Sequence, residues 1–153
     1  MLVKDKTIDY LFWDIGVTSN HNDNWGDNGN KGIRVRDESG TTLSAQTGKT
    51  WVQFFAQSTA TFFTNPFTVE FEVVSYINTP AIRFTDNSAN KVHQVSTGIW
   101  KITIGTNSIT VLKDGQLQSH YLSGLEGKDC KVFFELSENE DVIKYNNFRI
   151  YSI

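Results

Sequence analysis

Cysteine is nearly absent from this sequence, since Cys130 is the only one among 153 residues. A disulfide-stapled mini-protein is therefore excluded, and we expect Cys130 to be a small buried side chain. No apolar run approaches the roughly 20 residues that span a bilayer, so we expect no insertion into a membrane. A basic excess is missing too, because the formal net charge is −3. The charge balance therefore gives no electrostatic reason to expect binding to nucleic acid or to an anionic membrane surface.

Apolar and aromatic residues, by contrast, are plentiful. The chain is 39% hydrophobic, 13% aromatic and 20% charged, which is the composition of a folded chain with a core and not of a disordered one. Its length is close to that of one domain, so we expect residues 1–153 to form a single domain.

Short strand signals run from one end of the chain to the other. β-Branched and aromatic residues gather in segments separated by Asn, Asp, Gly and Ser, and no segment repeats apolar residues with a sustained helical period. Asp114-Gly115 is the sharpest hairpin signal. About ten strands without intervening helices predict an all-β fold, a two-sheet antiparallel β-sandwich. The expected strands are 9–15, 32–36, 50–56, 67–77, 81–84, 91–95, 99–104, 108–113, 130–136 and 145–153.

Alternation along these strands divides the aromatic residues into two groups. We expect one group to lie between the sheets, namely Phe12, Phe67, Phe71, Phe84, Trp100, Phe134 and Phe148. The remainder is Trp25, Tyr76, Phe133 and Tyr151. These four are the aromatic candidates for contact with a ligand, although for Trp25 we favour burial under the edge of the sandwich.

Several segments resemble strands of the concanavalin A-like and laminin G-like jelly-roll superfamily. The closing segment Tyr145–Ser152 is similar to the last strand of that superfamily, and Phe67–Val74 is similar to a central strand. Leu11–Asp14 is similar to an opening strand, and the Val111–Leu117 hairpin resembles a recurrent turn on the ligand side. The resemblance implies a jelly roll, a fold that carries lectins, glycosidases, adhesion domains and virion proteins alike.

Catalytic motifs are incomplete. Glycosidases of this superfamily carry Glu-x-Asp-x-x-Glu on one strand, where the flanking carboxylates act as nucleophile and acid/base roughly 5 Å apart. The corresponding segment here places Glu70, Glu72 and Ser75 at those positions, so the third carboxylate is missing. Gly-x-Ser-x-Gly and His-Glu-x-x-His motifs are absent as well. We therefore expect a protein that is not an enzyme.

Sugar recognition needs flat apolar surface for the ring and polar groups for the hydroxyls. The residues that supply both kinds on the predicted outward faces are Trp25, Glu70, Glu72, Tyr76, Arg83, Phe133, Asn147, Arg149 and Tyr151. A merely solvated sheet face would give the same pattern without a ligand. The polar loop from Ser19 to Asn30 is rich in oxygen ligands of the kind that calcium prefers, with Asp23 and Asp27 as its candidate metal ligands. The alternative is a surface loop rich in Asx-turns.

These patterns predict a lectin-like domain that binds carbohydrate or a cell-surface glycan, for instance in attachment. The alternative is a phage structural protein of the tail, fibre or capsid decoration, which would contact virion subunits or further copies of itself. Met1–Lys6 lacks the apolar stretch of a secretory signal, which fits a phage product made in the cytoplasm or a fragment of an extracellular or virion protein. A hydrolase with a degenerate or unrecognised motif ranks third.

Overall fold

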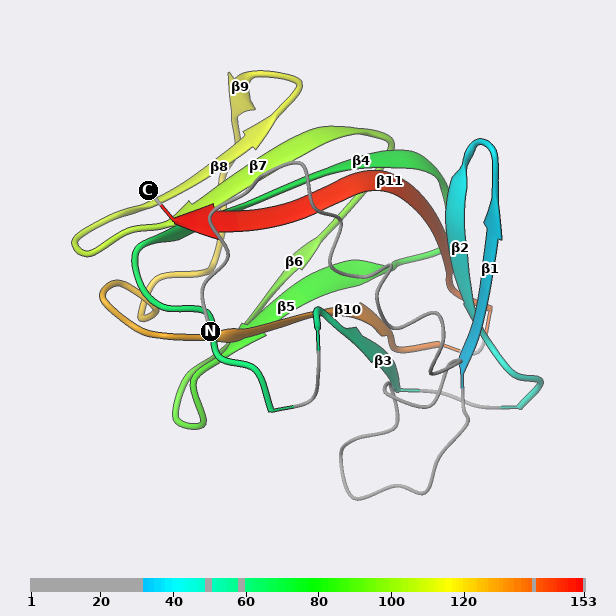
Figure 1. The fold of residues 1–153 in the computed structure, drawn as a ribbon, viewed down its shortest axis with the longest axis horizontal. Coiled ribbons are helices and arrows are strands. Elements are labelled where there is room, and N and C mark those ends of the chain that lie inside the picture. The colour runs from blue at the N-terminus through cyan, green and yellow to red at the C-terminus, as the bar shows by residue number, and fades with distance from the viewer. Residues whose placement is uncertain (1–31, 49–50, 58–59, 139, 153) are drawn as a thin grey trace.

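The computed structural model describes residues 32–48, 51–57, 60–138 and 140–152. These residues form two antiparallel sheets packed face to face (Figure 1). The seven-stranded sheet has the order β1 (Gly32–Asp37), β2 (Gly40–Ala45), β11 (Val142–Ser152), β4 (Phe67–Ile77), β7 (Gly98–Ile104), β8 (Ile109–Lys113), β9 (Gln116–Leu117). The four-stranded sheet has the order β3 (Val52–Phe55), β10 (Lys131–Leu136), β5 (Ala81–Thr85), β6 (Asn90–Gln94). The predicted all-β two-sheet sandwich is confirmed.

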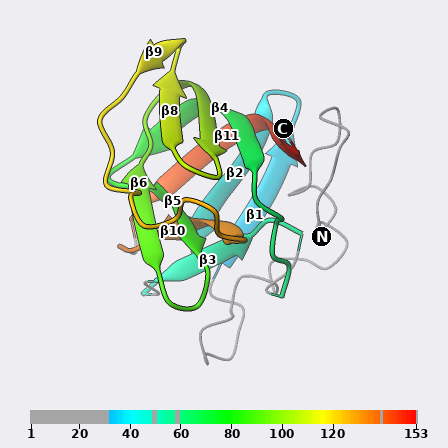
Figure 2. The same ribbon diagram turned by 90° about the vertical axis from the view of Figure 1, so that its left-hand side faces the viewer.

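Five of the nine strand pairs in the described sheets join strands that are not consecutive in the chain. The chain changes sheet between β2 and β3, again before β4, and again before β5. Strands of the two sheets, seen as two layers in Figure 2, therefore alternate along this part of the chain. Such crossings are typical of Greek-key and jelly-roll sandwiches. Within the described part of the chain, no helix is long and apolar enough to cross a membrane.

Local turn chemistry sets the hairpins. Asp114 and Gly115 have φ angles of 51° and 78°, the left-handed pair that a two-residue hairpin turn requires, and they join β8 to β9. Gly40 begins β2 with φ of 144°, and a Cβ placed there would lie 2.5 Å from the backbone oxygen of Tyr145. A side chain at position 40 would therefore collide with β11.

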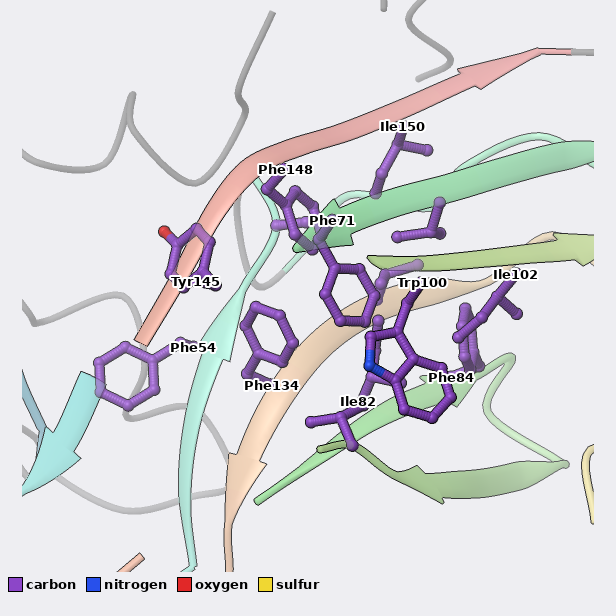
Figure 3. Packing of buried hydrophobic residues seen from close by; sticks show 14 of the residues in the cluster. Phe54, Phe71, Ile82, Phe84, Trp100, Ile102, Phe134, Tyr145, Phe148 and Ile150 are labelled. Atoms are coloured by element: carbon purple, nitrogen blue, oxygen red, sulfur yellow. The ribbon is translucent and has the colours of Figure 1, made fainter. Parts of the chain in front are cut away.

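An aromatic core fills the space between the sheets (Figure 3). Phe134 lies at its centre and is 1% exposed. Its ring meets Phe71 edge-on with centroids 5.2 Å apart and meets Phe148 at 5.5 Å, which are favourable aromatic geometries. The predicted core aromatics within the described residues are confirmed as buried, namely Phe67, Phe71, Phe84, Trp100, Phe134 and Phe148. Phe12 lies outside the described residues.

Two bulges interrupt the pairing of β4 with β11. On β4, Val74 is skipped, because Lys144 pairs with Ser75 and Tyr145 with Val73. On β11, two residues oppose one between the pairs of Asn146 and Arg149, and Asn147 there has φ of 53°. A bulge shifts the alternation by one residue. These two shifts decide which polar side chains share the outer face of the seven-stranded sheet.

Candidate functional site

A groove of about 210 Å³ lies over the centre of the seven-stranded sheet. Its lining residues come from β4, β7 and β11, and they are Glu70, Phe71, Glu72, Ile99, Asn147 and Arg149. We call it the carboxylate groove. The β11 bulge returns Arg149 to the face that carries Glu70, because these two residues are paired in the ladder.

Charged residues of three neighbouring strands form a row at the groove, although Lys101 does not line it. Arg149 of β11 is opposite Glu70 of β4, which in turn is opposite Lys101 of β7. Next to this row, Glu72 is opposite the exposed Ile99. Among the described residues, neither Arg149 nor Lys101 makes an ion pair. The basic groups therefore keep their hydrogen-bonding capacity for a bound molecule.

Tyr151 fixes one carboxylate of the groove. Its hydroxyl donates a hydrogen bond to Oε2 of Glu70. Burial raises the pKa of the Tyr151 phenol far above its usual value, and the facing Glu70 carboxylate raises this pKa further. The phenol thus stays protonated at physiological pH and remains a donor to Glu70.

Glu72 differs from Glu70 in its surroundings. It is half-buried, and in the part of the chain that the structure describes its carboxylate accepts no hydrogen bond. Since residues i and i+2 of a strand point to the same face, Glu70 and Glu72 project side by side with Cα atoms roughly 6.5–7 Å apart. The groove therefore presents one carboxylate held by a phenol and a second one open to a ligand.

Other predicted ligand residues lie away from the groove. Tyr76 pairs with the core residue Ile143, so the β4 bulge turns it to the side opposite that of Glu70 and Glu72. Arg83 belongs to the four-stranded sheet and binds Glu135 through Nε and Nη2, at 3.1 and 2.7 Å. The structure thus separates Tyr76 and Arg83 from the carboxylates that alternation had grouped with them.

Phe133 lies on the outer face of the four-stranded sheet, as alternation predicts, but it is only 1% exposed. Its ring stacks on Phe55 with centroids 4.3 Å apart. The ring is therefore not offered to a ligand from solvent, which corrects the expectation that it is free. Trp25, Asp23 and Asp27 lie outside the described residues.

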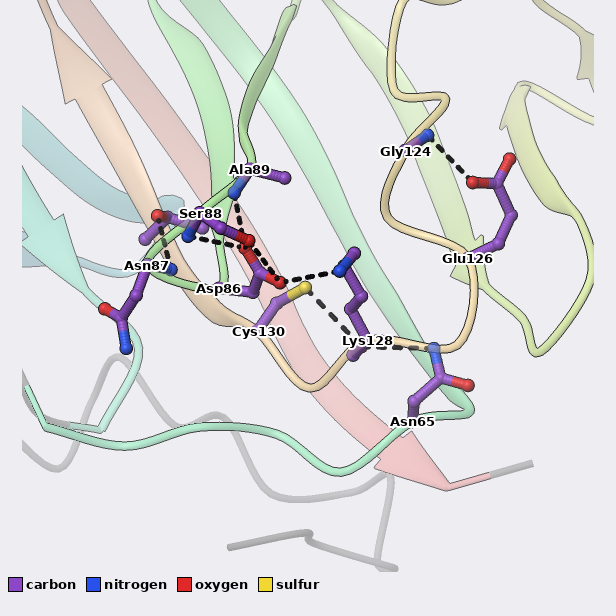
Figure 4. A network of polar contacts seen from close by, with 10 residues as sticks. Asn65, Asp86, Asn87, Ser88, Ala89, Gly124, Glu126, Lys128 and Cys130 are labelled. Carbon is purple, nitrogen blue, oxygen red and sulfur yellow. Dashed lines mark hydrogen bonds and ion pairs between the residues drawn. The ribbon is translucent and has the colours of Figure 1, made fainter.

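A second polar cluster surrounds the turn between β5 and β6 (Figure 4). Asp86 accepts hydrogen bonds from the backbone of Ala89 and Ser88 and pairs with Lys128 at 3.2 Å. The bond from Ala89 is the largest cause that lowers the pKa of Asp86 well below its usual value. These contacts close a turn. In the described ranges, no three His, Cys, Asp or Glu side chains are grouped so as to hold a metal ion.

Cys130 lies beside this cluster and is fully buried. Burial raises the pKa of its thiol to about 12, so the reactive thiolate is scarce at physiological pH. The prediction that Cys130 is a small buried side chain is confirmed.

Comparisons with known proteins establish the fold. No family model matches the chain, and no curated protein matches it. Among solved structures, the chain is similar to a protein from Parabacteroides distasonis ATCC 8503 named "Putative glycosyl hydrolase". The two share 10% identity over 79% of this chain and 90% of that one, with a TM-score of 0.51. At this identity the likeness shows a common β-sandwich fold, while membership of the concanavalin A-like superfamily stays a prediction.

This comparison also corrects the expectation that the protein is not an enzyme. That expectation rested on the missing third carboxylate at Ser75. The similar structure bears the name of a glycosyl hydrolase, so the absence of one superfamily motif is no ground for excluding catalysis on this fold.

Proposed function

We propose that this protein acts on carbohydrate through the carboxylate groove. The observation that carries the proposal is the gathering of Glu70, Glu72, Arg149 and Asn147 around one hollow of the seven-stranded sheet. Sugar hydroxyls both donate and accept hydrogen bonds, so carboxylates match their hydrogens and a guanidinium or amide matches their oxygens.

Apolar surface beside these groups suits the C–H face of a sugar ring. Ile99 is 58% exposed and lies directly opposite Glu72 in the ladder. A ring seated on Ile99 would bring its hydroxyls to Glu72 on β4. The name of the structurally similar protein supports the same ligand class.

A second candidate function is hydrolysis of a glycosidic bond in this groove. It is favoured by the unlike environments of the two carboxylates, since paired acids with different surroundings can take different roles. Glu70 accepts the Tyr151 hydrogen bond, which holds its carboxylate in one orientation and suits a nucleophile or base. Glu72 is the partner for proton transfer.

Binding to a glycan panel tests the proposed ligand class. The proteins are the natural sequence, Glu72→Gln, Arg149→Ala and the control Glu38→Gln, whose carboxylate is exposed in the turn between β1 and β2. Hydrogen bonds to charged groups contribute about 1.5–3 kcal/mol, so we expect affinity to fall about 10- to 100-fold in the two groove variants. The control should bind like the natural sequence.

Release of reducing ends from the bound glycans tests the second candidate. Hydrolysis should disappear in Glu70→Gln and in Glu72→Gln while Glu38→Gln retains it. If the natural sequence binds no glycan and releases no sugar, the proposed function is wrong. If Glu72→Gln and Arg149→Ala bind as tightly as the control, the carboxylate groove is not the site.

A further inference from the structure

Two hollows lie along β6, away from the carboxylate groove. One, of about 280 Å³, is lined by Tyr76, Asn78, Thr79, Gln94, Val95 and Ser96. The other, of about 320 Å³, is lined by Val92, His93, Gln94, Ser119, His120 and Tyr121. Gln94 contributes to the lining of both hollows, and we call the pair the β6 cleft.

β6 is an edge strand that pairs only with β5 in the described sheet. The backbone N–H of Val95 donates to Pro80 on the β5 side. Because backbone groups alternate in direction along an antiparallel strand, those of Gln94 turn to the free edge. The cleft thus runs beside backbone that β5 does not cover.

His93 holds the two walls of the cleft together. Its Nδ1 lies 2.7 Å from the carbonyl oxygen of Gln94, and its Nε2 lies 3.3 Å from that of Ser119 in the segment after β9. The ring also meets Trp100 edge-on, with centroids 5.3 Å apart. These contacts position the Ser119–Tyr121 segment against β6 before any ligand binds.

One exposed phenol ring lines each of the two hollows. Tyr76 is 42% exposed and Tyr121 is 90% exposed, although large aromatic side chains usually bury most of their surface. The first hollow is also lined by Asn78, Gln94 and Ser96. None of the residues that line the two hollows is an Asp, Glu, Lys or Arg. The lining therefore combines aromatic and imidazole rings with amide and hydroxyl residues.

We propose that the β6 cleft is a second carbohydrate-binding site that takes a neutral sugar chain, an inference that rests on the proposed function. Aromatic faces pack against sugar rings, and amides and hydroxyls bind their hydroxyl groups. The absence of Asp, Glu, Lys and Arg from its lining distinguishes this cleft from the carboxylate groove. The cleft holds a glycan at a distance from the carboxylates.

An extended peptide added to the edge of β6 is the alternative occupant. Such a peptide would need the carbonyl of Gln94 as an acceptor in a continuous ladder. Nδ1 of His93 lies 2.7 Å from that carbonyl oxygen, and its ring meets Trp100 edge-on, so an added strand would compete with the imidazole for this acceptor. The observations therefore favour a sugar over a peptide strand.

Affinity electrophoresis in gels containing uncharged polysaccharides (glucans, mannans, xylans) tests the proposal. Tyr76→Ala and Tyr121→Ala each remove one ring, and Ile77→Ala is the matched control because Ile77 is 55% exposed and lines neither hollow. We expect each tyrosine variant to bind its polysaccharide about two- to tenfold more weakly, as loss of one aromatic contact implies. Tyr121→Phe, which keeps the ring, should bind like the natural sequence.

The outcomes separate this site from the carboxylate groove. If no polysaccharide or oligosaccharide binds the natural sequence, both proposals are overturned. If Arg149→Ala weakens binding while Tyr76→Ala and Tyr121→Ala bind like Ile77→Ala, only the β6 cleft is overturned. Selection of an extended peptide whose binding needs Tyr121, with unchanged polysaccharide affinity in Tyr121→Ala, would also overturn the sugar assignment.

Discussion

Arg83 is the residue at which a structural role and a ligand-binding role make opposite predictions. Its guanidinium makes a two-point contact with Glu135 and a further hydrogen bond of 2.9 Å to Asn90. The two side chains of the ion pair are only 18% and 6% exposed. The perturbation is Arg83→Met, which keeps much of the apolar stem and removes the charge.

The expected loss follows from leaving the Glu135 carboxylate buried without its partner. Breaking a buried pair by removing one side costs about 3–5 kcal/mol, and the partial exposure of Arg83 reduces this to about 2–3 kcal/mol. For a chain of this length the loss corresponds to a fall in melting temperature of roughly 5–10 °C. Arg83→Lys, which keeps the charge without the planar fork, should lose about half as much.

Urea unfolding followed by tryptophan fluorescence measures these free energies of unfolding, and Glu135→Gln together with the double variant completes a mutant cycle. We expect a coupling energy of at least about 1 kcal/mol between Arg83 and Glu135, because residues in direct contact do not contribute additively. A coupling energy below about 0.3 kcal/mol would refute the reasoning. So would a variant that keeps its stability but loses glycan binding, since Arg83 would then act on the ligand.

Three further predictions concern the core, a turn and the thiol. Phe134→Ala should lower the free energy of unfolding by about 3–5 kcal/mol, whereas Phe134→Leu should lose less; equal losses in urea unfolding would contradict the aromatic packing described. Gly40→Ala should destabilise the fold more than Gly115→Ala. Both glycines have positive φ, but of the two only Gly40 has a backbone atom within 4 Å of the added Cβ. The melting temperature of Gly40→Ala should therefore be the lower one, and the reverse order would contradict the contact with β11. With a thiol pKa of about 12, native Cys130 should react with a disulfide reagent at pH 8 only as fast as the chain unfolds, and rapid labelling without urea would contradict its burial.

The sheet pattern could be predicted from the sequence because strand and core signals agree locally. The segment Phe67–Ile77 alternates apolar and polar residues clearly enough that its expected bounds match those of β4. β2 could not be predicted from the sequence, because Gly40–Ala45 contributes one large apolar side chain, Leu43, to the core and otherwise carries small residues. Its pairing partners lie on β1 and β11. Long-range pairing of that kind is not visible in local composition.

The candidate site could be predicted only in part. Side chains alternate between the two faces of a strand, so a shift of one residue moves all the following side chains to the other face. Glu70 and Glu72 lie on the face that alternation predicts because both precede the bulge of β4, and the bulge of β11 returns Arg149 to the same face. Tyr76 does not lie on that face, because skipping Val74 reverses the face of the β4 residues that follow it.

A bulge needs no distinctive residue on β4, where Val74 continues the apolar pattern of Val73. Its position is set by the pairing with β11, which contains a bulge of its own at Asn147. The face on which a residue near the end of a strand lies is thus set by the pairing register with the neighbouring strand, and the sequence of its own strand does not reveal it. The register shift at Val74 separates Tyr76 from the carboxylate groove and leaves it in the lining of the β6 cleft, while the bulge at Asn147 brings Arg149 to the groove, so each proposed sugar site depends on a bulge of its own.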